Sequence, residues 1–281
     1  MYKNFKISGF CDEASGEIVT QFETITKLGV EFYEPRMING KNISSLNEEE
    51  TAELASIMEN YGITASSIGS PIGKIKQEDD FEAHFELYKN TVKVAKSIGA
   101  KYIRMFSFFL PEDKDYDTYT DFVVEKLTRM VKYAEEEGVI LLHENEKGIY
   151  GNIARRCKVL FEKIQSPNFR AVFDFSNFIE CGQETLEAYE MLKPYIEYIH
   201  IKDNRAGVGV LPAGEGDGKI EEILRDLYKN GFDGYLSLEP HLFKYVVGDD
   251  ASELVKSFET DKQKTYAVAY EALVKVLDKI S

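Results

Sequence analysis

Glycine recurs along this chain at nearly regular intervals, each time after a helix-like stretch and before a strand-like one. The five contexts are KLGVEFYE, NYGITASS, SIGAKYIR, EEGVILLH and NGFDGYLS, which contain Gly29, Gly62, Gly99, Gly138 and Gly231. The first four glycines are 33, 37 and 39 residues apart, and the last two are 93 apart, which equals three units of 31. Pro167 and Pro194, which also stop helices, mark two boundaries inside that longer gap. Because glycine readily adopts the left-handed conformation just past a helix, this spacing predicts a repeated helix–strand unit.

Eight short strand-like segments fit the same repeat, and stretches with helical periodicity lie between them. The segments are approximately Lys6–Phe10, Val30–Pro35, Thr64–Gly69, Tyr102–Phe108, Val139–Glu144, Ala171–Phe175, Tyr198–Asp203 and Tyr235–Glu239. Eight alternating units in 281 residues predict an α/β fold, a single (β/α)8 TIM barrel, with one domain spanning residues 1–281. The alternative is a doubly wound open sheet, which usually has a glycine-rich turn after its first strand. The sequence at that point, FCDEASGE, lacks such a turn.

The composition excludes several other classes of protein. Hydrophobic residues make up 43% of the chain, too many for a disordered protein, and no apolar run approaches the roughly 20 residues that cross a bilayer. A net charge of −15 without any basic run argues against nucleic acid as a partner. Three cysteines without a CxxC pair predict reduced, mostly buried thiols. The segment Met1–Phe10 lacks the apolar stretch of a signal peptide, so we expect a soluble, cytoplasmic protein without a membrane partner.

Four polar side chains directly follow apolar strand-like runs in the second half of the chain. They are Glu144 in LLHENEKG, Asp174 in AVFDFSN, His200 in YIHIKD and Glu239 in LSLEPH. Active sites of TIM barrels form at the C-terminal ends of the strands, so these side chains are expected to converge. Three carboxylates at one point repel one another unless a cation neutralises them. Taken singly, Asp174 also fits a helix cap, the glutamates fit surface charges, and His200 fits a core residue. Together they predict a site for one divalent metal ion, Mn²⁺, Mg²⁺, Co²⁺ or Zn²⁺.

The motifs ENEKG, FDFSN, HIKD and LEPH, in this order, resemble those of the xylose isomerase-like TIM barrels. This superfamily of sugar and sugar-phosphate isomerases and epimerases includes the ketose 3-epimerases, and the resemblance extends over nearly the whole chain. It implies that Glu144, Asp174, His200 and Glu239 are the metal ligands. The family often has His three residues after the Asp, where this chain has Asn177. Since Asn is a poor zinc ligand, Asn177 and the negative net charge disfavour an endonuclease IV-like activity.

The resemblance also implies a reaction. A bound metal ion polarises the carbonyl of a sugar, and Glu144 and Glu239 serve as the acid/base pair that moves the proton on the neighbouring carbon through an enediolate. The expected function is therefore that of a metal-dependent sugar or sugar-phosphate isomerase or epimerase. Two alternatives stay open: a metal-dependent dehydratase of an inositol-ketone-type substrate, and a barrel that binds metal or sugar without catalysis.

Further polar residues near the strand ends are candidates for binding a small-molecule carbohydrate. Arg205 resembles the family's substrate-contacting Arg, and Asn177 can still hydrogen-bond to substrate hydroxyls. Arg36 and Lys202 are expected to face the same end of the barrel, with Lys74 a weaker candidate and a pairing of Arg36 with Glu34 the alternative. His143 and His241 adjoin ligand positions, which suggests supporting roles. The glycine-rich loop 207–218 is interpreted as a mobile flap. The family is often dimeric or tetrameric, but no motif in this sequence decides the oligomeric state.

Overall fold

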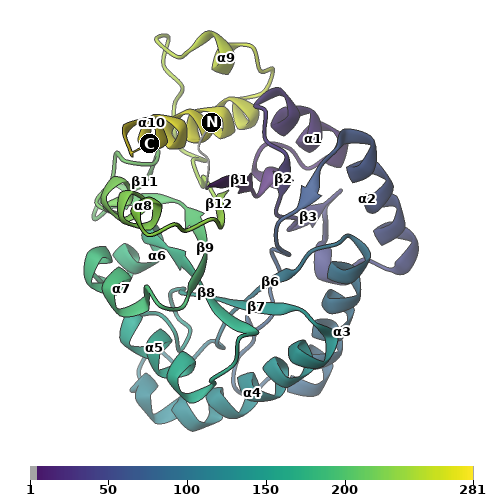
Figure 1. Ribbon diagram of the computed structural model, residues 1–281, viewed down its shortest axis with the longest axis vertical. Coiled ribbons are helices and arrows are strands. Elements are labelled where there is room, and N and C mark those ends of the chain that lie inside the picture. The colour runs from purple at the N-terminus through teal and green to yellow at the C-terminus, as the bar shows by residue number, and fades with distance from the viewer. Residues whose placement is uncertain (1–4, 281) are drawn as a thin grey trace.

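Parallel strands form the inner wall of the molecule, and helices surround them in a ring (Figure 1). The structure is a computed structural model and describes residues 5–280. Residues 1–4 and 281, which the predicted domain includes, lie outside the described residues. The wall contains β1 (Lys6–Gly9), β2 (Phe32–Tyr33), β5 (Thr64–Ala65), β6 (Tyr102–Met105), β7 (Ile140–Glu144), β8 (Phe169–Asp174), β9 (Ile196–Ile201) and β12 (Tyr235–Leu238). Each of these strands overlaps one of the predicted segments.

The pairing of these strands is parallel and closes around the barrel. Six strands form one sheet in the order β1-β12-β9-β8-β7-β6, and β2 pairs with β5. Further backbone hydrogen bonds join the two sheets. The N–H of Glu34 donates to the carbonyl of Gly9 (3.0 Å), and the N–H of Ile68 donates to the carbonyl of Tyr102 (2.9 Å). The predicted TIM barrel is therefore confirmed.

The helices follow the strands as the repeat predicts. They are α1 (Ile18–Lys27), α2 (Glu48–Tyr61), α3 (Phe81–Ser97), α4 (Thr120–Glu137), α5 (Ala154–Lys163), α6 (Phe175–Glu180), α7 (Thr185–Leu192), α8 (Ile220–Lys229), α9 (Glu253–Lys256) and α10 (Asp261–Ile280). Two antiparallel pairs lie outside the wall, β3 (Met37–Ile38) with β4 (Lys41–Asn42) and β10 (Asp203–Arg205) with β11 (Gly209–Leu211). The five repeated glycines all have φ between 67° and 75°. Their left-handed conformation confirms the reason for the spacing.

Some strand ends differ from the prediction. β2 stops at Tyr33 because Glu34 bonds to Gly9 on the other side and Pro35 has no N–H to continue the ladder. β8 and β9 begin two residues earlier than expected, because a polar residue at the second position of each strand, Arg170 or Glu197, interrupts the apolar pattern. Arg170 and Glu197 on these two strands form an ion pair with Nε 3.5 Å from Oε2.

The interior of the barrel changes from apolar to charged along its axis. At one level, Leu142, Val172 and Tyr198 form a buried cluster that Tyr102 and Tyr235 help to close. The hydroxyl of Tyr198 donates to a buried carboxylate, that of Glu34, at 2.8 Å. Charged side chains therefore lie next to a layer of aromatic side chains, Tyr102, Tyr198 and Tyr235, which we call the aromatic floor. Among the described residues, none of the helices is long and apolar enough to cross a bilayer. Cys11 and Cys157 are buried and Cys181 is partly exposed, all as free thiols.

Candidate metal centre

The structure brings the four predicted ligands together at the C-terminal ends of four neighbouring strands. Glu144 ends β7, Asp174 ends β8, His200 lies on β9, and Glu239 directly follows β12. All four are buried, with exposed fractions between 0% and 4%. One ligand atom from each residue lies within 4.8 Å of the others. The parallel register explains this convergence, because β8 pairs Asp174 with His200 on β9, and β9 pairs His200 with Ser237 on β12.

Carboxylates contact both nitrogens of the His200 ring. Its Nδ1 lies 3.0 Å from Oε1 of Glu144 and 3.5 Å from Oε2 of Glu239. Its Nε2 lies 3.3 Å and 3.4 Å from the two oxygens of Glu34. Burial alone lowers the pKa of an imidazole, but Glu144 and Glu34 raise the pKa of His200 to about 10. In the metal-free protein the ring therefore carries a proton at Nδ1, the nitrogen that faces Glu144 and Glu239.

The three ligand carboxylates have shifted pKa values, as expected for buried charged groups that lie close together. Burial, with added repulsion from Glu239 and Glu144, raises the pKa of Asp174 to about 8 against the attraction of Lys202. Burial also acts to raise the pKa of Glu144, but His200 and Arg104 lower it to about 2. Lys202 and His200 likewise hold the pKa of Glu239 well below its usual range. Two of the three carboxylates are thus ionised at neutral pH.

One oxygen of this cluster has an unmet requirement. Oδ2 of Asp174 is buried and has no hydrogen-bond partner, although the ammonium of Lys202 lies 3.0 Å away as an ion pair. A buried carboxyl oxygen without a hydrogen bond is costly. Three carboxylates and one imidazole are donors that Mn²⁺, Mg²⁺, Co²⁺ and Zn²⁺ accept. The residues present therefore fit a single divalent cation.

Three cationic side chains lie against the ligands. Lys202 donates to Oε2 of Glu239 at 3.1 Å, and Arg104 donates through Nη1 to Oε2 of Glu144 at 3.1 Å. Arg36 lies 3.4 Å from Oε1 of Glu239. The expected positions of Lys202 and Arg36 at this end of the barrel agree with the structure.

Arg36 has other partners than the one considered from the sequence. It pairs with Asp12 (2.9 Å) and Glu13 (3.2 Å) in the 3-10 helix η1 (Cys11–Glu13), in place of Glu34. The reason is that Glu34 is already satisfied at the aromatic floor, where the hydroxyls of Tyr198 and Ser237 donate to it.

Asn177 supports the ligands from the first turn of α6. Its backbone N–H donates to Oδ1 of Asp174 (2.8 Å), so Asp174 caps this helix and still presents its second oxygen to the cluster. The side-chain amide of Asn177 donates to Oε1 of Glu144 at 3.3 Å and to the carbonyl of Asn145 at 2.9 Å. The helix-cap and metal-ligand interpretations of Asp174 are therefore compatible.

Arg205 does not join the cluster. It lies on β10, its side chain is 52% exposed, and it bonds to the carbonyl of Glu215 and faces Asp217 at 3.9 Å. The loop that follows is organised by Asp203, whose buried carboxylate accepts the N–H groups of Gly214, Gly216 and Gly218 at 2.9 Å to 3.0 Å. Lys74 pairs with Glu146 at 3.0 Å.

The two histidines that adjoin ligand positions differ in direction. His143 bonds through Nε2 to the hydroxyl of Ser107 (2.9 Å), and burial lowers its pKa to about 4. It packs outside the cluster, against Phe161 and Phe169. His241 faces the cluster, with Nε2 3.8 Å from Oε1 of Glu239 and 3.6 Å from Glu13.

Sequence reasoning missed two buried charges in the site, Glu34 and Arg104. Both lie within or beside strands, in FYEP and YIRMF, where a single charge interrupts an apolar run. A charge inside a strand whose neighbours are apolar is the signal that could have found them, because such a group needs a buried partner.

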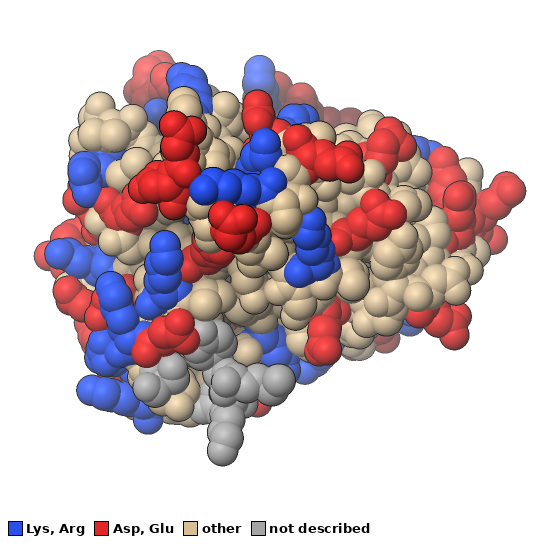
Figure 2. Space-filling model, turned by 90° about the horizontal axis from the view of Figure 1, so that it is seen from above, with Lys and Arg blue, Asp and Glu red and all other residues tan. Residues whose placement is uncertain are grey.

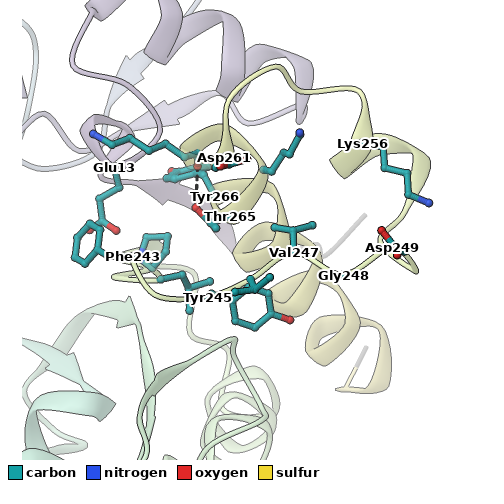
Figure 3. Close-up of a pocket in the computed structure, with 15 residues that line it drawn as sticks. Glu13, Phe243, Tyr245, Val247, Gly248, Asp249, Lys256, Asp261, Thr265 and Tyr266 are labelled. Carbon is teal, nitrogen blue, oxygen red and sulfur yellow. Dashed lines mark hydrogen bonds between the residues drawn. The ribbon is translucent and has the colours of Figure 1, made fainter.

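A cavity of about 600 Å³ opens beside the cluster, between the segment after β12 and helix α10. Figure 3 shows Glu13, Tyr266 and Thr265 on one side and Phe243 and Tyr245 on the other. Glu13 links this cavity to the cluster, since it also bonds to Arg36 and accepts the backbone N–H of His241. On the face shown in Figure 2, basic side chains are interspersed with acidic ones.

Comparison with known proteins extends these observations. The profile of the xylose isomerase-like TIM barrel family matches residues 22–260. An uncharacterized protein of Methanocaldococcus jannaschii is 25% identical over 221 residues, which cover 75% of this chain and 71% of that protein. Among solved structures, an IolI protein with a bound zinc atom is 17% identical, with a TM-score of 0.76 and coverage of 98% and 99% of the two chains. A D-tagatose 3-epimerase-like protein is 17% identical, with a TM-score of 0.73 and coverage of 98% and 100%.

Proposed function

The chain belongs to the xylose isomerase-like TIM barrel family, and on this premise we propose that it is a metal-dependent isomerase or epimerase of a carbohydrate or carbohydrate phosphate. The observation that carries the proposal is the convergence of Glu144, Asp174, His200 and Glu239 within 4.8 Å, two of them glutamates with lowered pKa values. The IolI protein and the D-tagatose 3-epimerase-like protein, which share the fold, support the reaction class.

In this proposal Glu144, Asp174 and Glu239 hold one divalent cation through oxygen, and His200 holds it through Nδ1. When bound, the cation supplies Lewis-acid polarisation of a substrate carbonyl and lowers the energy of negative charge on its oxygen. His200 has to give up its Nδ1 proton on loading, while Nε2–H continues to donate to Glu34. That second contact fixes the tautomer and the orientation of the ring.

The chain's own residues move the proton. Glu144 and Glu239 are both buried and ionised, so each can accept a proton from the carbon next to the carbonyl. Nη1 of Arg104 lies 3.1 Å from Glu144 and 3.9 Å from Glu239, so one cationic group is close to both carboxylates. One glutamate removes the proton and the other returns one, to the neighbouring carbon in an isomerase or to the opposite face of the same carbon in an epimerase.

Solvent isotope exchange tests the proposal. The protein loaded with Mn²⁺ is incubated in D₂O with dihydroxyacetone, D-fructose or D-tagatose, and deuterium at carbon is followed by NMR. We expect metal-dependent exchange that falls by about 10²- to 10⁴-fold in Glu144→Gln and in Glu239→Gln, as for loss of a general acid or base. Glu53→Gln, an exposed change on α2, is the matched control. Near-normal exchange in both site variants with metal bound would refute the acid/base assignment.

Isotope exchange and a separate absorbance assay with an inositol ketone distinguish the alternatives. A dehydratase forms a product with new ultraviolet absorbance from an inositol ketone, and a barrel without catalysis binds a ketose without exchange. We further propose a small-molecule carbohydrate as partner, a cytoplasmic location, one domain over residues 1–281 and a homo-oligomer. The mixed surface charge and the net charge of −15 support the exclusion of nucleic acid.

A further inference from the structure

Lys202 is a buried cation placed against two ligands of the proposed metal centre. It directly follows β9, two residues after His200, and is 6% exposed. Its Nζ lies 3.0 Å from Oδ2 of Asp174 and 3.1 Å from Oε2 of Glu239, to which it donates a hydrogen bond. The ammonium therefore joins carboxyl groups that come from two different strands of the barrel.

The oxygens that Lys202 contacts are the ones that face the cluster. Oδ1 of Asp174 accepts the N–H of Asn177 at the start of α6, so Oδ2 is the oxygen that Asp174 presents to the cluster. In Glu239 the corresponding oxygen is Oε2, which lies 3.5 Å from Nδ1 of His200. Lys202 thus contacts the two oxygens through which Asp174 and Glu239 would hold a metal ion.

The two arginines of the site contact the outer oxygens of the ligands instead. Arg104 donates to Oε2 of Glu144 (3.1 Å), and Oε1 of that carboxylate faces the imidazole of the cluster (3.0 Å). Arg36 lies 3.4 Å from Oε1 of Glu239. Among the lysine and arginine side chains that the structure describes, Lys202 is therefore the one that contacts cluster-facing oxygens.

The charge of the site explains why a cation is needed there before any metal ion binds. Three ligand carboxyl groups and Glu34 are buried around the ring of His200. Burial of so many acidic groups is costly unless cations lie among them. The ammonium of Lys202 offsets part of this cost, but it also repels a dication that approaches the same oxygens.

We propose that Lys202 is the internal counter-ion of the metal centre: its ammonium holds Asp174 and Glu239 together in the unloaded protein and opposes the binding of a divalent cation to the same oxygens. The inference rests on the proposed function and adds a control on its metal loading. A lysine that only positions the two ligands strengthens metal binding, whereas a counter-ion weakens it. The sign of the change in metal affinity when the charge is removed therefore separates the two roles.

Calorimetric titration of the metal-free protein with Mn²⁺ at pH 7 tests the proposal. In Lys202→Gln, which removes the charge and keeps a side-chain donor, Mn²⁺ affinity should rise at least about tenfold, because a positive charge this close opposes a dication even when strongly screened. Lys202→Arg keeps the charge, so its affinity should not rise by more than about threefold. Lys74→Gln, at the same end of the barrel but paired with Glu146 at 3.0 Å, is the matched control. Its affinity should stay within about threefold of wild type.

Thermal unfolding gives a second readout, which is independent of catalysis. Without metal, Lys202→Gln should unfold about 5 °C or more below wild type, since two buried acidic groups lose a shared partner. Saturating Mn²⁺ should raise the unfolding temperature more in this variant than in wild type, because tighter binding to the folded state stabilises it more. A variant that is unfolded without metal should fold when Mn²⁺ is added, and failure to fold with Mn²⁺ present would contradict the proposal.

Several results would overturn the proposal. Equal or weaker Mn²⁺ binding in Lys202→Gln assigns Lys202 to the positioning of its two partners. An equal rise in Arg36→Gln, which removes a cation from an outer oxygen of Glu239, assigns the effect to the overall charge of the site. If the wild-type protein binds Mn²⁺ and exchanges deuterium in these cases, the proposed function stands and only the role of Lys202 fails. If the wild-type protein binds no Mn²⁺, both fail.

Discussion

Glu34 should control the affinity of the site for metal although it is not a ligand. It is fully buried and lies within 3.4 Å of Nε2 of His200, while Tyr198 (2.8 Å) and Ser237 (2.5 Å) donate to the same carboxylate. The proposed perturbation is Glu34→Gln, which keeps the shape of the side chain and removes its charge. The variant leaves all four proposed ligands in place.

The magnitude follows from the change in charge at His200. Loading removes one proton from Nδ1 and brings two positive charges, so the positive charge that faces Glu34 rises by one. A hydrogen bond to a charged group contributes about 1.5–3 kcal/mol, which corresponds to roughly tenfold to 150-fold in affinity. Loss of the partner of a metal-binding His typically costs about 10- to 100-fold. We therefore expect Mn²⁺ affinity to fall about 10- to 100-fold in Glu34→Gln.

Calorimetric titration of the metal-free protein with Mn²⁺ at pH 7 measures this change. Tyr198→Phe is the matched control, because it removes one hydrogen bond to Glu34 but leaves the carboxylate facing His200, and its affinity should stay within about fivefold of wild type. Circular dichroism of each variant verifies the fold. Unchanged Mn²⁺ affinity in a folded Glu34→Gln variant would refute the reasoning, since His200 would then be oriented without Glu34.

Two further predictions concern the loop between β5 and α3, which borders the site. Gly73 has φ of +88°, and a Cβ there would lie 2.0 Å from the carbonyl oxygen of Phe106, so Gly73→Ala should lower the free energy of unfolding by more than about 3 kcal/mol in a urea titration. Gly62→Ala, with φ of +67° and open space, should cost only about 1–2 kcal/mol, and equal costs would contradict the clash. His84 accepts a hydrogen bond from the N–H of Gly73 (2.7 Å), and burial lowers the pKa of His84 below 6.5. The contribution of this neutral imidazole to stability is therefore present above pH 6.5 and is lost as the pH falls through the pKa of His84 in the folded protein. Thermal unfolding between pH 7 and 5 should show a shallower decline in His84→Gln, and identical slopes would argue against this role.

The fold could be predicted because its determinants are local and periodic. Gly29, Gly62, Gly99, Gly138 and Gly231 each end a helix in the left-handed conformation, and that requirement is visible in a single sequence. The ends of strands were less predictable where they depend on pairing with residues that are distant in the sequence. The early start of β8, for example, comes from its pairing with β7, where Phe169 lies opposite Leu141 and Arg170 opposite Leu142, and no local pattern encodes that pairing.

Some residues of the site could likewise be predicted from local sequence, and others could not. Glu144, Asp174, His200 and Glu239 each follow an apolar run at a strand end, so the barrel geometry predicts that they meet. Arg205 was chosen from a resemblance, and the structure leaves it half exposed on β10.

The sequence marks Arg104 and Glu34 as charges in apolar strands, but it does not show which residues they contact. Their roles depend on which distant residues face them, Glu144 for one and His200 for the other, across 40 and 166 residues of chain. Such pairings arise only from the closed barrel.

The central claim is that one divalent cation binds among four side chains distant in sequence. A crystal soaked with Zn²⁺ and measured at the zinc absorption edge tests it most directly. The account predicts one strong anomalous peak per chain, about 2.0–2.2 Å from an oxygen of Glu144, Asp174 and Glu239 and from Nδ1 of His200. A peak confined to other residues, or none at this position, would contradict it.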